Sequence, residues 1–305
     1  MNRRLIYTIL VLVAILVVFL LVALIGPALD PDLKLDETAL LRFVFVGIGL
    51  LVVFVVYWLT RSSGVWDVGT RQVVYMAIGA ALYAVFSYLF NGTVFAVPSV
   101  SQVALRPAVA IPIFFGYAFG PTVGFFTGAV GNMFGDALTG FGLSPQWSIG
   151  NGLIGMIAGM AALFADKKKS MNVVLIICAA VAAIATLLFF LNRGVVNEMF
   201  FDPYGQPVSL IAGISAAVGF VLALIVRFVF DQNIDVAAAV TWGMLGNFLG
   251  LGFAAISDIW INGYPPTVAI VGEFLPAAGP NMIFAAILVP ILVVAYMSIR
   301  RQAGR

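Results

Sequence analysis

The sequence predicts an all-α fold: a polytopic membrane helix bundle with about ten transmembrane helices. Composition, the spacing of long apolar windows and the distribution of Lys and Arg all point to this class. Hydrophobic residues make up 63% of the 305 residues, charged residues make up 9%, and the mean hydropathy is +1.13. A soluble domain has about a quarter of its residues charged, so this chain cannot cover itself with a polar surface. We therefore expect an integral protein of the lipid bilayer.

Ten windows are long and apolar enough to be spans, since crossing a bilayer core takes about 20 apolar residues. The first follows Arg3 and Arg4 and exceeds the apolar region of a signal peptide, so we expect an uncleaved anchor helix. The predicted spans are 5–27, 40–60, 72–91, 103–119, 122–140, 147–165, 171–191, 208–230, 236–256 and 281–299.

The basic residues support this count and fix an orientation, because loops on the cytoplasmic side carry an excess of Lys and Arg. With the N-terminus inside, eleven basic residues fall at inner ends and four at outer ends. We therefore expect both termini in the cytoplasm. The inner residues are Arg3, Arg4, Arg61, Arg71, Lys167, Lys168, Lys169, Arg227, Arg300, Arg301 and Arg305, and the outer ones are Lys34, Arg42, Arg106 and Arg193.

The minor residues exclude several function classes. The chain has no histidine, which removes Ser-His-Asp catalysis and most zinc sites. Its few lysines form no nucleotide-binding phosphate loop, and a net charge of +2 gives no sign of a nucleic-acid partner. The single cysteine, Cys178, can form no intramolecular disulfide. We expect no enzyme activity, no cofactor and no metal site.

Composition changes along the chain and predicts two parts. Residues 1–71 hold two Leu/Val/Ile-rich spans followed by a polar linker, and are interpreted as a two-helix membrane anchor. From residue 72 the helices are rich in Gly, Ala, Asn and Pro, which allows close packing and cavities. Residues 72–305 are therefore interpreted as the functional membrane domain.

The most informative stretch runs from Arg106 to Asp136. Gly120-Pro121 predicts a tight inner turn between two antiparallel helices, and glycines at three- and four-residue spacing line the second helix from Gly124 to Gly135. This hairpin returns a cation, Arg106, and an anion, Asp136, to the same outer level.

This pattern resembles the substrate-binding S components of energy-coupling factor (ECF) transporters, in the order Leu-Arg-Pro, Phe-Gly-Pro with following glycines, then Gly-Asp. The segments 147–165 and 279–290 look like the family's fourth and last helices. The resemblance implies an S-component-like core of six helices and a substrate-specific subunit of an ECF-type ABC importer. Such a subunit captures a small water-soluble vitamin or related micronutrient outside a prokaryotic cell. It works with a coupling transmembrane subunit and ATPase subunits in the plasma membrane.

Ten spans exceed the six of a typical member, and two arrangements remain open. Either 171–230 is an inserted hairpin and 236–299 supplies the last two core helices, or 171–230 supplies those helices and the last pair is the addition.

The candidate substrate-binding residues are polar side chains within apolar helices, which need partners when buried, and groups in the predicted outer loops. The segment Ser257–Pro280 is predicted as a long loop acting as a lid, with a short interfacial helix at Thr267–Phe274. Its aromatic rings would either stack on a flat ligand or belong to an interfacial belt. The candidates are Arg106, Asn132, Asp136, Trp147, Asn151, Asn247, Asp258, Trp260, Tyr264, Glu273 and Asn281.

The resemblance also implies that small residues on the first core helix dock the coupling subunit. Here these are Ala77, Ala80, Ala81 and Ala84, although intrachain packing uses the same residues.

Two other functions compete with this interpretation. A stand-alone secondary transporter would want a charge at the membrane midplane, and no span carries a convincing one. An intramembrane aspartyl protease would need Asp136 and a second carboxylate, for which Asp258 is the plausible partner.

Overall fold

The computed structural model describes residues 3–90, 96–97, 103–104, 106–139, 142–196, 198 and 205–304, and it is a bundle of helices. The helices are α1 (Arg3–Leu29), η1 (Pro31–Leu33), α2 (Ala39–Thr60), η2 (Gly64–Trp66), α3 (Thr70–Phe90), η3 (Pro107–Val109), α4 (Ala110–Phe119), α5 (Pro121–Thr139), α6 (Pro145–Gly159), η4 (Met160–Leu163), α7 (Lys167–Leu191), α8 (Leu210–Val229), α9 (Ile234–Ile261), α10 (Pro266–Val268), the π-helical η5 (Ala269–Phe274) and α11 (Leu275–Gln302). Two-residue strands β1 (Ala96–Val97) and β2 (Val103–Ala104) pair antiparallel.

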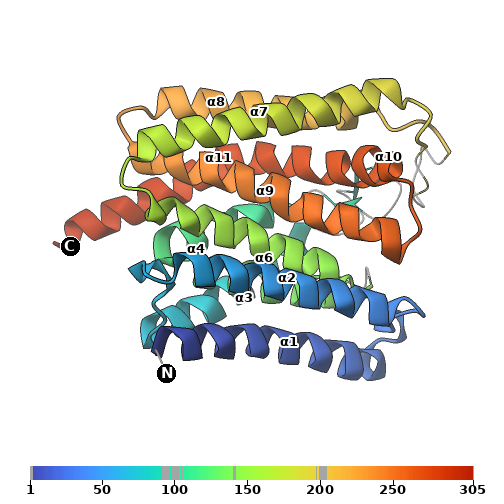
Figure 1. Ribbon diagram of the computed structural model, residues 1–305, viewed down its shortest axis with the longest axis horizontal. Helices are drawn as coiled ribbons and strands as arrows, with labels where there is room; N and C mark the ends of the chain where they lie inside the picture. Colours follow the sequence, from blue (N-terminus) through green and yellow to red (C-terminus); the bar gives the residue numbers. More distant parts are fainter. Residues whose placement is uncertain are drawn as a thin grey trace.

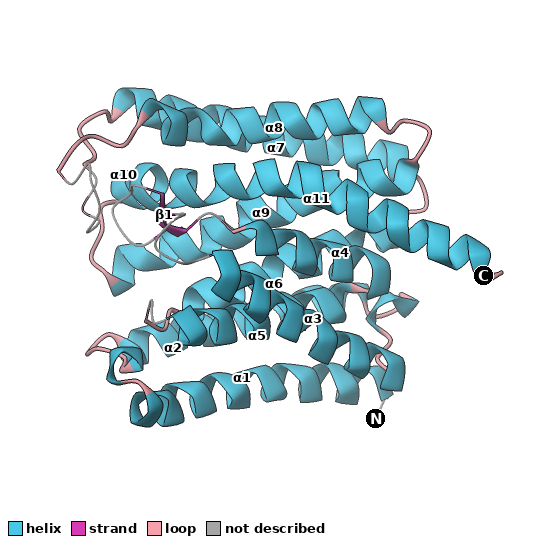
Figure 2. Ribbon diagram, turned by 180° about the vertical axis from the view of Figure 1, so that it is seen from behind, coloured by secondary structure: helices cyan, strands magenta, loops and turns pink. Residues whose placement is uncertain are grey.

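The helices run roughly side by side, and both termini lie at the same end of the bundle (Figure 1). We call this the terminal end and the opposite end the distal end; the α1–α2, α5–α6, α7–α8 and α9–α10 connections lie at the distal end. Figure 2 shows the layers from behind: α1 at one edge, then α2, α3 and α5, then α6 and α4, then α9 and α11, with α7 and α8 at the opposite edge.

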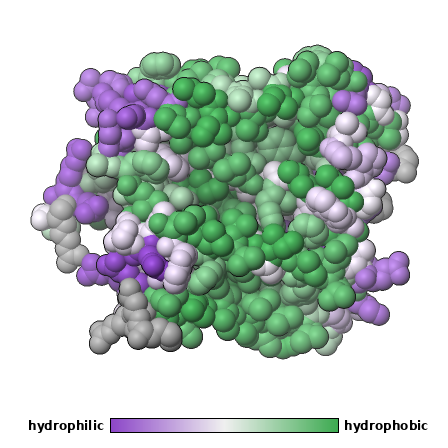
Figure 3. Space-filling view, viewed as in Figure 1, coloured by the Kyte–Doolittle hydropathy of each residue, from purple (hydrophilic) through white to green (hydrophobic). Residues whose placement is uncertain are grey.

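The surface has the polarity of a membrane protein. Apolar side chains cover the middle of the molecule, and hydrophilic ones gather at its two ends (Figure 3). Within the described residues, seven helices are long and apolar enough to cross a membrane: α1, α2, α3, α7, α8, α9 and the continuous α10–α11 helix. The apolar helix Pro107–Phe119 is shorter. The prediction of an all-α polytopic bundle is confirmed.

Each of the ten predicted spans contains a helix, although several boundaries differ, and the last span begins at Pro266 instead of residue 281. The span predicted from residue 103 begins as a helix at Pro107, because Val103 and Ala104 belong to β2. Arg106 therefore lies just before the helix, at its N-cap position.

The middle layers form the interior. The most apolar windows of α1 and α2 are 22% and 17% buried, so these helices present most of their surface outward. The equivalent window of α9 is 78% buried, and every described side chain of α6 except Trp147 is buried. Helix α6 packs against α4, α5 and α9, which places its polar groups at the centre of the bundle.

Glycine allows the close approach of α5 and α6. A Cβ atom on Gly128 would lie 2.1 Å from the carbonyl oxygen of Asn151, which no side chain tolerates. The inner turn between α4 and α5 has Gly120 at φ +109°, a left-handed conformation that glycine adopts readily. The predicted Gly120-Pro121 turn is thus present and sets the two helices antiparallel.

The prediction of a long loop over Ser257–Pro280 is wrong. Helix α9 continues to Ile261, and after a connection of Asn262 to Pro265 the chain is helical again from Pro266. The predicted short helix at Thr267–Phe274 is helical but runs without a break into α11. The Ser215 hydroxyl of α8 donates to the Leu275 carbonyl at 3.0 Å, so α8 contacts the proline-containing start of α11.

Candidate functional site

A buried ion pair joins the residue before the α4 segment to the last turn of α5. A guanidinium nitrogen of Arg106 lies 3.0 Å from the Oδ1 atom of Asp136, and their side chains are 16% and 5% exposed. The sequence placed these residues at one level on a hairpin, and the structure brings them into contact. Since removing either partner would leave a buried charge, the pair holds the two segments together.

Residues of α5 and of two further helices, α3 and α6, complete a polar network around this pair. Asn132, one turn before Asp136 on α5, accepts a hydrogen bond from Arg106 and donates to Asp136 Oδ2 at 2.8 Å and to the Ser148 hydroxyl at 3.0 Å. The Tyr83 hydroxyl on α3 contacts Oδ1 of Asn132 at 3.1 Å. Side chains from α3, α5 and α6 are therefore linked by hydrogen bonds around the Arg106–Asp136 pair.

The network continues along α6 to α9. The Tyr83 hydroxyl also lies 3.0 Å from Oδ1 of Asn151, whose amide nitrogen donates to the carbonyl of Trp147 at 2.9 Å. The Trp147 indole N–H donates to Oδ2 of Asp258 at 2.8 Å, and the Gln146 amide donates to Oδ1 at 3.1 Å. We call this set of hydrogen-bonded residues, from Asp136 to Asp258, the distal network.

A separate polar group lies between α8, α9 and α11. Asn247 donates to the carbonyl of Ala278 at 2.7 Å and accepts from the Asn281 amide at 3.3 Å. Glu273, in the π-helical η5, is 0% exposed. A single π-helical turn of this kind is frequent at functional sites. Among the described residues, the side-chain hydrogen bonds of Asn247 and Asn281 stay within this group.

Two predicted candidates lie nearer the surface at the distal end. Tyr264 is half-buried in the α9–α10 connection, and burial raises the pKa of its phenol, as do the nearby charges of Glu273 and Asp258. Trp260 is 59% exposed on α9, and its ring lies 5.7 Å from that of Phe45 on α2. Tyr264 therefore lies near the carboxylates of Asp258 and Glu273, whereas Trp260 lies on the outer surface.

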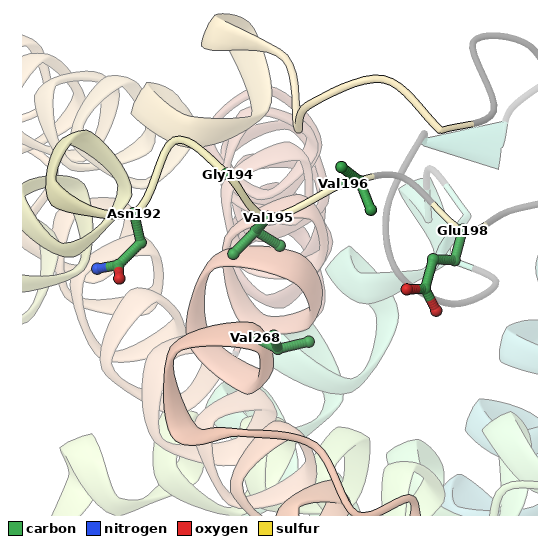
Figure 4. Close-up of a pocket in the computed structure, with 6 residues that line it drawn as sticks. All are labelled: Asn192, Gly194, Val195, Val196, Glu198 and Val268. Carbon is green, nitrogen blue, oxygen red and sulfur yellow. The ribbon is translucent and has the colours of Figure 1, made fainter.

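A cavity of about 320 Å³ opens at the distal end between the α7–α8 connection and α10 (Figure 4). Figure 4 shows Val268 below it, with Asn192 and Glu198 on opposite sides. Residues 197 and 199–204 of the α7–α8 connection lie outside the described residues.

The four alanines of the predicted docking surface divide into two pairs. Ala77 and Ala81 are exposed on α3, whereas Ala80 and Ala84 are each 6% exposed. The buried pair faces α5, where a Cβ on Gly131 would lie 3.0 Å from the Ala80 carbonyl. Ala80 and Ala84 are therefore not on an exposed surface in this structure.

Sequence reasoning missed Tyr83, Gln146 and Ser148. In the sequence, Tyr83 is one more aromatic residue in an apolar helix. The signal that could have placed it in the interior is its three-residue spacing from Ala80, which puts both residues on one face of the helix. Gln146 and Ser148 flank Trp147, and their polarity at the start of an apolar window is the signal that could have identified them.

The terminal end has its own ionic links. Asp235, at the start of α9, accepts from the Tyr117 hydroxyl at 2.7 Å and from the Lys167 ammonium at 2.5 Å. In the α8–α9 connection the Arg227 hydrogen bond lowers the pKa of Asp231, with Lys168 adding to it. These contacts join α4, α7, α8 and α9 at the end that carries most of the basic residues.

Within the described residues, no group of three or more His, Cys, Asp or Glu side chains lies close enough to hold a metal ion. What the distal network offers is a set of hydrogen-bond donors and acceptors inside an apolar bundle, which suits reversible binding of a polar small molecule.

Comparison with the sequences of known proteins places this chain in a family. A UPF0397 protein of Vibrio atlanticus is 30% identical over 173 residues, covering 53% of this chain and 92% of the relative. A UPF0397 protein of Aliivibrio fischeri is 27% identical over 176 residues, covering 54% and 91%. One from Photobacterium profundum is 37% identical over 93 residues, covering 30% and 49%. No solved structure matches the chain significantly.

The family described as "ECF-type riboflavin transporter, S component" matches residues 67–230, which is more than half of the chain and runs from just before α3 to the end of α8. This is a family of transporter subunits and not of enzymes. The protein is therefore a member of the S-component family of ECF-type transporters.

Proposed function

We propose that this protein captures a small water-soluble vitamin or related micronutrient outside the cell, as the substrate-specific subunit of an ECF-type ABC importer. Family membership supports the class of function, and the buried distal network supports the site. Many polar groups held inside an apolar bundle are costly unless they are paired with one another or with a ligand.

The distal end faces the outside in this proposal, in the plasma membrane of a prokaryote. The terminal end carries both termini and the Lys167–Lys169 run, as well as Arg227, Arg300 and Arg301. Because cytoplasmic ends collect Lys and Arg, this end faces the cytoplasm. Solute then reaches Asp136, Trp147 and Asp258 from outside without crossing the bundle.

The proposed binding core consists of α3 to α6 with α9 and α11, and α7–α8, which the family match includes, lies beside it. The family match ends with α8, yet α9 packs on α6 and α4, and α11 packs on α4 and α9. Figure 1 shows α7 and α8 at the edge of the bundle beyond α9 and α11. Helices that contribute to the distal network, as α9 does through Asp258, belong to the binding core.

Coupling uses the exposed side of α3. Val73, Val74, Ile78, Leu82 and Val85 are exposed there together with Ala77 and Ala81, which form a broad apolar strip with small residues within it. Small residues let a second helix approach closely within a membrane. The proposed occupant is the coupling transmembrane subunit, which connects this chain to the ATPase subunits.

Two measurements test the proposed function. The full chain, co-expressed with the coupling subunit and ATPases of its own organism, should co-purify with them. The full chain alone, purified in detergent, should retain a small solute that mass spectrometry detects in the extract. A chain that binds neither solute nor coupling subunit would contradict the proposal.

A further inference from the structure

Asp258 differs from the other carboxylate of the distal network. It is 2% exposed, and both oxygens accept hydrogen bonds from neutral donors, the Gln146 amide and the Trp147 indole. Among the described residues no cation lies within ion-pair distance of it. Asp136, in contrast, is balanced by Arg106 at 3.0 Å.

Gln146 adds a second acceptor beside Asp258. Its Nε2 atom donates to Asp258, and its Oε1 atom is buried without a hydrogen-bond partner among the described residues. The residue is 1% exposed, so water does not readily satisfy this oxygen. A carboxylate without a counter-ion and an amide oxygen without a donor therefore lie side by side. Both would be satisfied by a ligand group that carries positive charge and N–H donors.

The surroundings of Asp258 are acidic. The Tyr264 phenol lies within the electrostatic influence of Asp258, Glu273 and Glu198. Glu198 also lines the distal cavity. The charge of Arg42 acts on Asp258 and Tyr264 from a distance, but its ion pair, at 3.5 Å, is with Asp36. The negative electrostatic potential of these groups attracts a cationic solute that enters from the distal end and repels an anionic one.

We propose that the captured solute carries a positively charged nitrogen group, a protonated amine or a cationic heterocycle, which binds Asp258 and donates a hydrogen bond to Oε1 of Gln146. This assignment rests on the proposed capture function and names its substrate class. The Arg106–Asp136 pair is internally neutral, so it shapes the site without selecting the charge of the solute.

The test compares three full-length proteins purified in detergent from the same bacterial culture conditions: wild type, Asp258→Asn, and Asp32→Asn as a matched control on the exposed α1–α2 connection. Small molecules are extracted from each and identified by untargeted mass spectrometry. We expect a compound enriched in the wild type that is cationic at pH 7. The amount of this compound should fall at least about tenfold in Asp258→Asn, because a charge-assisted hydrogen bond is lost. It should be unchanged in Asp32→Asn.

A neutral or anionic compound enriched in the wild type would overturn the assignment and leave the capture function intact. Equal retention by Asp258→Asn and the wild type would also overturn it. No enriched compound in the wild type would instead count against the capture function, so the two failures are distinguishable. Should Asp258→Asn give no folded protein, judged by a monodisperse elution profile, the charge of the wild-type compound decides alone.

Discussion

The indole nitrogen of Trp147 lies 2.8 Å from Oδ2 of Asp258 and joins the first turn of α6 to the last turns of α9. The carbonyl of the same tryptophan accepts from Asn151 at 2.9 Å. Trp147 is thus the residue through which the two halves of the distal network meet: the ion pair on one side and the carboxylate with neutral partners on the other. Trp147 itself is uncharged, so its role in the network is to hold α6 and α9 in position.

Replacing Trp147 by Phe keeps the ring and removes the donor. Oδ2 of Asp258 then loses its partner, and a buried acceptor left unsatisfied costs about 1–3 kcal/mol. We expect a lower midpoint of thermal unfolding in detergent and reduced solute retention. Trp58→Phe is the matched control, because Trp58 is 48% exposed on α2 and should change neither quantity. An unchanged midpoint and unchanged retention in Trp147→Phe would show that the indole hydrogen bond contributes nothing.

The Arg106–Asp136 pair should behave as a coupled unit. Arg106→Gln leaves the buried carboxylate of Asp136 without its cation, and breaking a buried pair in this way costs about 3–5 kcal/mol. Asp136→Asn leaves the guanidinium uncompensated. The double variant removes both charges, so we expect it to be more stable than the sum of the single losses predicts. Thermal unfolding of the four proteins gives the coupling energy, and simple additivity would contradict a direct interaction.

Much of this arrangement could be predicted from the sequence, because its signals are local. Apolar windows identify spans, and Asn132 or Asp136 within such a window must find partners. What could not be predicted is which groups pair. Whether Tyr83 lies beside Asn151 depends on how α3 and α6 pack around α5, and no spacing along the chain encodes that.

In the α9–α10 region the sequence-based prediction was wrong, because a local signal was given too much weight. The sequence predicts a long loop here because it contains Gly263 and prolines at 265, 266, 276 and 280. In the structure only the short connection around Gly263 is non-helical, since packing against α8 and α9 supports helix beyond the prolines. Tertiary contacts overrode propensity here, and Trp260 consequently lies on a helix surface and not in a lid.

Topology can be tested with reporters fused to the chain. Alkaline phosphatase is active only outside the cytoplasm, and green fluorescent protein fluoresces when it is inside. Fusions after Lys169 and after Arg305 should be fluorescent and lack phosphatase activity, because α7 begins and α11 ends at the terminal end. A fusion at Gly205, in the α7–α8 connection, should give the reverse pattern. An external reporter at either of the first two sites would invalidate the proposed orientation.

The docking surface can be blocked without touching the distal network. Ala81 is exposed on α3, and a tryptophan there would prevent a second helix from approaching closely. We expect Ala81→Trp to abolish co-purification with the coupling subunit while solute retention stays at the wild-type level. Ala183→Trp is the matched control, because Ala183 is an exposed alanine on α7, at the opposite edge of the bundle. If both variants lose the coupling subunit, the effect is not specific to α3. If Ala81→Trp loses solute as well, this side of α3 supports the binding site and is no docking surface.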